Sequence, residues 1–160
     1  MRWLDRLIEG LAVLGVAAFG AAALITVADI IGRQFGHAIN GVVDLVQLFV
    51  TAGAWFVIPW AFVAGAHVGV EFIVAQMPRL SQRALAILAA LLAGGVLVLM
   101  LRYGYDTFER RAMMGDRSQQ LGIPIAWYWW PLLAGQAAAI LAVLSVIVHL
   151  LRGNGRGESG

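Results

Sequence analysis

Residues 118–148 read SQQLGIPIAWYWWPLLAGQAAAILAVLSVIV, a stretch without a single Asp, Glu, Lys or Arg. Three shorter uncharged stretches precede it, at residues 10–28, 45–66 and 84–101. A helix needs about 20 apolar residues to cross the hydrocarbon core of a bilayer. Within that core the backbone N–H and C=O groups must be bonded inside the segment, which favours helices. The sequence therefore predicts an all-α integral membrane protein with four transmembrane helices.

Charges, glycines and prolines set the predicted ends of these spans. We expect a single membrane domain over residues 1–160, with spans at about 7–31, 43–66, 82–102 and 125–151, short loops and a disordered tail at 153–160. Ser81 is the expected N-cap of the third helix. Beyond its span, Arg102, Asp106 and Arg110 follow one another at intervals of four residues. That spacing favours ion pairs along one face of a helix that continues into water.

Small residues recur on three of the predicted spans and indicate where helices approach closely. They are Ala17, Gly20 and Ala21 in the first, Ala86, Ala90 and Gly94 in the third, and Ala134, Ala138 and Ala142 in the fourth. These faces are predicted to pack within the bundle or against another subunit.

The composition agrees with a membrane protein and excludes several functions. Hydrophobic residues make up 61% of the chain and charged residues only 12%, whereas soluble domains average about 25% charged residues. A net charge of +2 is too weak to suggest a nucleic-acid partner. With no cysteine, disulfides, thiolate metal sites and cysteine catalysis are all excluded.

Arginines on the two sides of the spans give a small bias in orientation. Four spans place both termini on one side, with the 67–83 loop, while the 32–41 and 112–122 loops lie on the other. The first side carries Arg2, Arg6, Arg79, Arg83, Arg152 and Arg156, and the second carries Arg33, Arg102, Arg110, Arg111 and Arg117. Because positive charge concentrates in cytoplasmic loops, this difference of one residue favours cytoplasmic termini.

Ionisable residues lie near the ends of the spans and not at their centres. A self-sufficient ion-coupled carrier would need a more central one, so the sequence indicates a scaffold or accessory subunit. Asp29 and Arg33 are four residues apart and can pair on one helix face. The polar residues at the span ends either mark the membrane boundary or form a seam that contacts a partner.

The three histidines raise a second possibility, a haem-bearing electron-transfer subunit, because haem proteins can use histidines of facing helices as axial ligands. His37, His67 and His149 all lie at the edges of spans, which favours surface or interface histidines instead. The sequence shows no pairing of a nucleophile with a base, no phosphate-binding glycine loop and no cluster with metal-ligand spacing. We therefore expect no enzyme activity, no cofactor and no metal.

Three segments resemble the small membrane subunit of the tripartite ATP-independent periplasmic (TRAP) transporters, the DctQ-like family. They are DIIGRQFG at residues 29–36 leading to Val43–Leu45, GAHVGVE at residues 65–71, and QLGIPI at residues 120–125 followed by the aromatic run 127–130. The resemblance covers nearly the whole chain. One departure is Val43 before Asp44, where the family often has two adjacent acids.

The resemblance implies a non-catalytic subunit of the bacterial inner membrane with cytoplasmic termini. Its partners would be a large permease subunit with the sodium-coupled transport path, a periplasmic substrate-binding protein and the lipid bilayer, and its substrates organic acids. An unrelated inner-membrane assembly or scaffold protein is a further alternative. The candidate partner-contact residues are Asp29, Arg33, Asp44, His67, Glu71, Arg117, Gly122 and Pro124.

Overall fold

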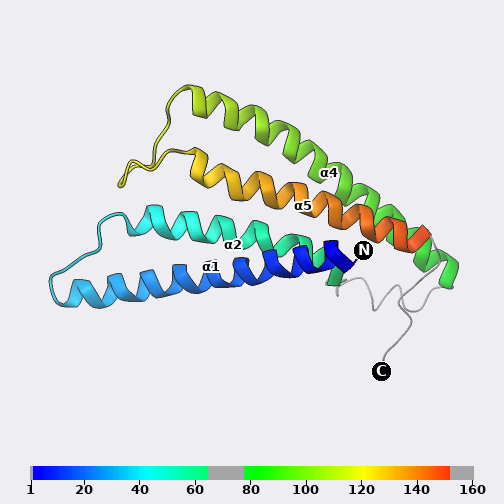
Figure 1. The fold of residues 1–160 in the computed structure, drawn as a ribbon, viewed down its shortest axis with the longest axis horizontal. Coiled ribbons are helices and arrows are strands. Elements are labelled where there is room, and N and C mark those ends of the chain that lie inside the picture. Colours follow the sequence, from blue (N-terminus) through cyan, green and yellow to red (C-terminus); the bar gives the residue numbers. More distant parts are fainter. Residues whose placement is uncertain (1, 65–77, 152–160) are drawn as a thin grey trace.

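The computed structural model describes residues 2–64 and 78–151, which form four helices. These are α1 (Arg2–Gln34), α2 (Val42–Ala64), α4 (Arg79–Met113) and α5 (Ala126–Leu151) (Figure 1). Each is long and apolar enough to cross a membrane. The predicted all-α membrane fold is therefore confirmed.

Two of the helices are longer than the predicted spans. With 33 residues in α1 and 35 in α4, they measure about 50 Å, whereas the hydrocarbon core is about 30 Å thick. The continuation of α4 was expected, and Arg102 does pair with Asp106 at 3.4 Å. Ser81 is not an N-cap, because Pro78 occupies that position and the helix begins at Arg79. Proline suits a helix start, since it lacks the N–H that would be unpaired there.

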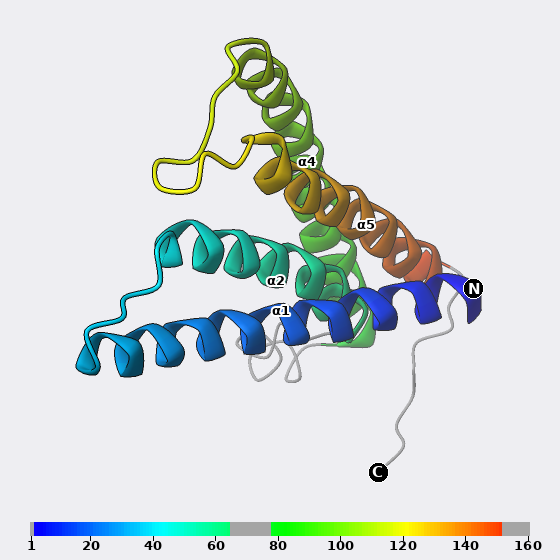
Figure 2. The same cartoon turned by 60° about the vertical axis from the view of Figure 1, so that its left-hand side comes forward.

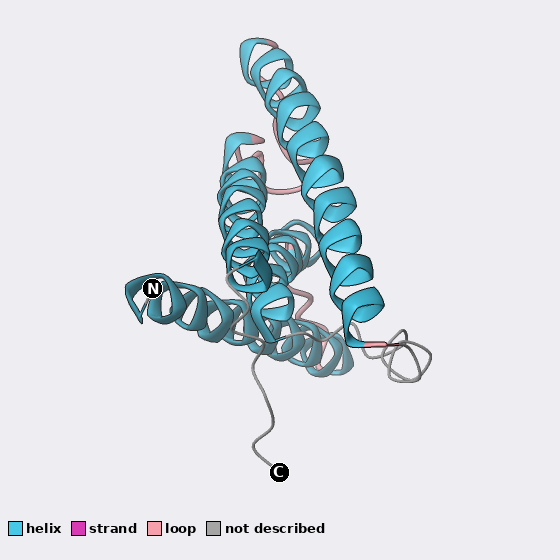
Figure 3. Ribbon diagram, turned by 90° about the vertical axis from the view of Figure 1, so that its right-hand side faces the viewer, coloured by secondary structure: helices cyan, strands magenta, loops and turns pink. Residues whose placement is uncertain are grey.

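The helices pack in the spatial order α1, α2, α5, α4 (Figures 1 and 3). The core lies where α4 and α5 meet and is built on Leu97, Ala139 and Val143. Trp55 and Phe62 of α2 pack against this cluster. As a result α5 is the most buried helix, while α1 and α4 form the outer edges.

Glycines at helix crossings let the backbones come close. A Cβ on Gly15 of α1 would lie 2.9 Å from the Gly53 carbonyl oxygen, and a Cβ on Gly53 would lie 3.0 Å from that of Gly15. Between α2 and α5, a Cβ on Gly135 would overlap the carbonyl of Trp55. The expected approach at Ala17, Gly20 and Ala21 is wrong for Gly20, which has no atom within 4 Å of the position of a Cβ. The close approach of α1 to α2 is made at Gly15 instead, and Gly20 faces away from it.

The long helices α1 and α4 end in the same way. After α1, Gly36 has φ +76°, and the amide of His37 donates to the Gly32 carbonyl at 2.8 Å. After α4, Gly115 has φ +69°, and the amide of Asp116 donates to the Arg111 carbonyl at 3.2 Å. Both are Schellman motifs, in which a left-handed residue turns the chain out of the helix.

Candidate functional site

Both described loops between helices, residues 35–41 and 114–125, lie at the same end of the bundle (Figure 1). We call this the loop end. The second loop reaches from the outermost helix, α4, toward the start of α2 (Figure 2). The candidate site is built here, because the buried acidic side chains of the described residues belong to this end.

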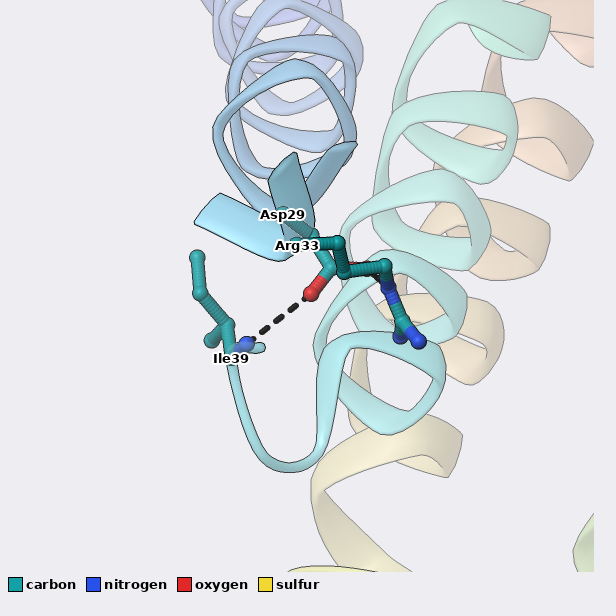
Figure 4. A network of polar contacts seen from close by, with 3 residues as sticks. All are labelled: Asp29, Arg33 and Ile39. Atoms are coloured by element: carbon teal, nitrogen blue, oxygen red, sulfur yellow. Dashed lines mark hydrogen bonds and ion pairs between the residues drawn. The ribbon is translucent and has the colours of Figure 1, made fainter. Parts of the chain in front are cut away.

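Asp29 ties the first loop to α1. Its side chain is buried, with 6% of the residue exposed, and an aspartate is seldom buried to that extent unless it is paired. One oxygen, Oδ2, accepts a hydrogen bond from Arg33 Nε at 2.7 Å. The other, Oδ1, accepts one from the backbone amide of Ile39 at 2.9 Å (Figure 4). The carboxylate therefore uses both oxygens, one within the helix and one on the loop.

The second loop has its own hydrogen bonds. The amide of Ser118 donates to the Ile123 carbonyl at 2.8 Å, and the amide of Ile123 donates to Ser118 Oγ at 2.9 Å. The Ile125 amide donates to the Asp116 carbonyl at 3.0 Å, next to a bridge between Arg117 and Pro124. Residues 116–125 thus form a small hairpin.

Asp44, in the first turn of α2, binds the tip of this hairpin. The residue is only 4% exposed. Its Oδ2 accepts hydrogen bonds from the backbone amides of Gln120 at 3.0 Å and Leu121 at 2.7 Å. The hydroxyl of Tyr128, at the start of α5, donates to the Asp44 backbone carbonyl at 3.0 Å. One residue of α2 therefore holds both the hairpin and the first turn of α5.

The two loops also touch each other. Gly41 is buried, has φ +81° and lies so close to Leu121 that a Cβ would overlap its side chain. Because Leu121 is also held by Asp44, the first loop, the hairpin and α2 form one connected surface. We call residues 35–41 and 114–125, with Asp29 and Asp44 beneath them, the loop platform.

The exposed charge of this end is mainly positive. Both carboxylates that hold the platform are buried, whereas the side chain of Arg33 is 61% exposed. Further exposed cations are Arg110, Arg111 and Arg117. Glu109 and the half-buried Asp116 offset part of this charge. The platform therefore suits contact with an acidic surface more than a reaction inside it.

Six of the eight candidate residues come together at the loop end. They are Asp29, Arg33, Asp44, Arg117, Gly122 and Pro124. His67 and Glu71 lie outside the described residues. Arg117 contacts the Gly122 carbonyl at 3.2 Å through Nη1 and so helps to close the hairpin.

The two histidines that the structure describes, His37 and His149, are not arranged as an axial pair. His37 lies in the first loop, whereas His149 is 23 residues into α5, about 35 Å along the helix. The Nδ1–H group of each ring donates a local hydrogen bond, from His37 to the Phe35 carbonyl and from His149 to the Ser145 carbonyl. Among the described residues, no group of three His, Cys, Asp or Glu side chains is placed to hold a metal ion.

Sequence reasoning missed Tyr128 and the backbone partners of the two carboxylates. Within the aromatic run 127–130, Trp127 and Trp130 are exposed, as in the aromatic belts found at membrane surfaces. Tyr128 points inward and is 7% exposed. The one tyrosine in a run of tryptophans could have indicated this contact, because a buried tyrosine hydroxyl usually has a hydrogen-bond partner.

The fold and this site define a class: four-helix membrane proteins whose buried acidic side chains organise the loops at one end. The sequence model of the family described as tripartite ATP-independent periplasmic transporters, DctQ component, matches residues 22–153. The chain therefore belongs to the DctQ family and is a component of a TRAP transporter. A comparison with curated proteins finds no match to this chain.

Proposed function

We propose that the chain is the small membrane subunit that supports a large permease subunit in sodium-coupled, binding-protein-dependent uptake of organic acids. The family match over residues 22–153 carries this proposal. The distribution of charge supports it, because the long uncharged stretches of the spans leave no central acid or base for an ion pathway. The large subunit would then supply the path and the sodium coupling.

Reconstitution tests this division of labour. Liposomes with this chain, the large subunit and the binding protein should take up a labelled organic acid along a sodium gradient. Liposomes that lack this chain should lose that uptake. Sodium-driven uptake by this chain alone would refute the proposal, as would full uptake by the large subunit and binding protein without it.

The proposed location is the bacterial inner membrane, with the loop end in the periplasm and both termini in the cytoplasm. The absence of native cysteine makes this simple to test. Single cysteines at the exposed positions Gln34 and Gln119 mark the loop end, and one at Ser81 marks the other end. A membrane-impermeant thiol reagent added to intact cells should label positions 34 and 119 only. Labelling at position 81 alone would show that the protein has the opposite orientation.

We assign docking of the binding protein to the loop platform. Arg117 on the platform and Arg33 beside it offer exposed positive charge on a surface that hydrogen bonds hold in place. In transient complexes such rim charges alter mainly the association rate and its salt dependence. Reversing a charge here should therefore weaken uptake most when the binding protein is scarce.

The charge reversals Arg33→Glu and Arg117→Glu test this assignment, with Arg6→Glu at the other end of α1 as the control. We expect all three variants to assemble with the large subunit. Uptake by the first two should fall at low concentrations of binding protein and recover at high concentrations, and the control should match wild type. Equal uptake by all variants at every concentration and salt level would show that these platform charges take no part in docking.

A further inference from the structure

A groove runs along the seam between α4 and α5. Its inner section is apolar and is lined by residues of both helices, among them Gly95 and Leu144. Its outer section, nearer the loop end, is lined by Leu133 of α5 and by α4 residues that include Arg102. Val98 borders both sections, and their α4 residues recur in steps of three and four along one helix face. The two sections therefore form one groove, which we call the α4–α5 groove.

The length of the α4–α5 groove matches the depth of one leaflet of a bilayer. From Leu91 to Tyr105 it follows 14 residues of α4, about 21 Å along the helix. Half of the hydrocarbon core is about 15 Å, and the head-group layer adds about 5–8 Å. Leu91 lies near the middle of the uncharged stretch 84–101, and Tyr105 lies just beyond its end. The groove thus reaches from the centre of the membrane to the head groups on the side of the loop end.

The charged end of the groove lies at the level of the head groups. Arg102 is the first charged residue after the uncharged stretch, and its Nη1 reaches toward the loop end to Asp106 Oδ1 at 3.4 Å. Asp106 is two residues before Phe108, which packs against Trp129 and Trp130 with ring centroids 6.3 and 6.2 Å away. Aromatic side chains gather at the head-group level of membranes. The stem of Arg102 can therefore lie along apolar surface while its guanidinium meets the head groups.

The polar groups at this end have free bonding capacity. The Arg102 side chain is 72% exposed and makes one long contact with Asp106, although a guanidinium has five N–H donors. Tyr105 also lines the groove and is 53% exposed. Phosphate oxygens are strong acceptors for a guanidinium. Asp106 would repel a head group of net negative charge but would attract an ammonium, so a zwitterionic head group suits the pair.

We propose that the α4–α5 groove binds a phospholipid of the bilayer, with one acyl chain along Gly95 and Val98 and the phosphate on Arg102 and Tyr105. The ammonium of a zwitterionic head group, as in phosphatidylethanolamine, then faces Asp106. Gly95 gives the acyl chain room, because no atom of the chain lies within 4 Å of the position of a Cβ. A groove that is apolar over the depth of one leaflet and charged only at its head-group end matches the pattern of such a lipid. This inference is independent of the proposed function, since the site belongs to this chain alone.

Native mass spectrometry of the purified full-length chain measures this binding. Phosphatidylethanolamine titrated into the micelles should add to the chain at one saturable site. The diacylglycerol with the same acyl chains lacks the phosphate and should bind about tenfold more weakly. Equal binding of the two lipids would show that the phosphate makes no specific contact, and it would overturn the inference.

Two variants locate the site. Arg102→Gln should lower the affinity for phosphatidylethanolamine by about tenfold and leave that for diacylglycerol unchanged. Gly95→Leu fills the groove and should weaken the binding of both lipids. The matched controls on α1 are Arg6→Gln, at an exposed position, and Gly20→Leu, where again no atom lies within 4 Å of the Cβ position. Both controls should bind like wild type, and wild-type affinity in either Arg102→Gln or Gly95→Leu would contradict the proposed site.

Photocrosslinking in native membranes tests which molecule occupies the groove. Leu144 lines the inner section and is exposed, so a benzoylphenylalanine at this position should form an adduct with a phospholipid. An adduct with another protein, or with a second copy of this chain, would show that a protein covers the groove and would overturn the inference.

Discussion

Removing the carboxylate of Asp44 should release the hairpin while leaving the helices in place. Asp44→Ala deletes the acceptor of two backbone hydrogen bonds, from Gln120 and Leu121. Hydrogen bonds to a charged group contribute about 1.5–3 kcal/mol each. Because both amides belong to exposed residues and can bond to water once released, we take the lower end, about 3 kcal/mol for the pair. That corresponds to about a hundredfold in the equilibrium for local opening of the loop.

Hydrogen exchange measures this opening directly, since amides exchange through local unfolding with its own free energy. In the purified wild-type protein the amides of Gln120 and Leu121 should be protected. In Asp44→Ala their exchange should be about a hundredfold faster. Asp44→Asn keeps a carbonyl acceptor but loses the charge, and charged bonds are roughly twice as strong as neutral ones. Its exchange should therefore be about tenfold faster than in wild type.

Asp116→Ala is the matched control, because it removes an acid from the same hairpin whose side chain takes no part in the Asp44 contacts. It should leave the protection of Gln120 and Leu121 unchanged. Equal protection in wild type and Asp44→Ala would refute the reasoning. It would mean that the internal bonds of the hairpin, and not Asp44, hold its tip.

Further predictions concern the stability of the platform and the haem alternative. Gly36→Ala should lower the free energy of unfolding in mixed micelles by about 1–2 kcal/mol, the cost of a left-handed residue. Gly41→Ala also places a side chain on a left-handed residue, and its Cβ would overlap Leu121. It should therefore lower the free energy of unfolding by about 1–3 kcal/mol more than Gly36→Ala. Equal decreases in the two variants would contradict the contact between Gly41 and Leu121. Tyr128→Phe removes the bond to the Asp44 carbonyl and should cost about 1 kcal/mol in the same assay. The absorbance spectrum of the purified chain should contain no Soret band, and such a band would restore the haem alternative.

Local features of this structure were predictable from the sequence, and long-range contacts were not. The pairs Asp29–Arg33 and Arg102–Asp106 follow from four-residue spacing, which places side chains on one face of any helix. The partner of Asp44 is the backbone of Leu121, 77 residues away. Every residue except proline has a backbone amide, so the residue type does not show which amide a carboxylate will bind. The sequence therefore located Asp44 near the end of a span but did not show what it holds.

Helix rotation was the second feature that the sequence could not supply. In a soluble helix the polar face shows which side is buried, but the spans here are apolar all round. Small residues then remain as the guide, and they occur on both sides. Gly15 packs against α2 while Gly20 is open, and Gly94 packs against α5 while Gly95 is open. The choice between them depends on the crossing of helices, which only the assembled bundle determines.

The loop platform should serve docking of the binding protein and not assembly with the large subunit. The hairpin follows directly from the end of α4, and Asp44 holds its tip against α2. If the platform receives the binding protein, Asp44→Ala should still co-purify with the large subunit, because the helices stay in place. It should lose uptake only when the binding protein is scarce. Loss of assembly in Asp44→Ala would instead assign the subunit contact to the loop end.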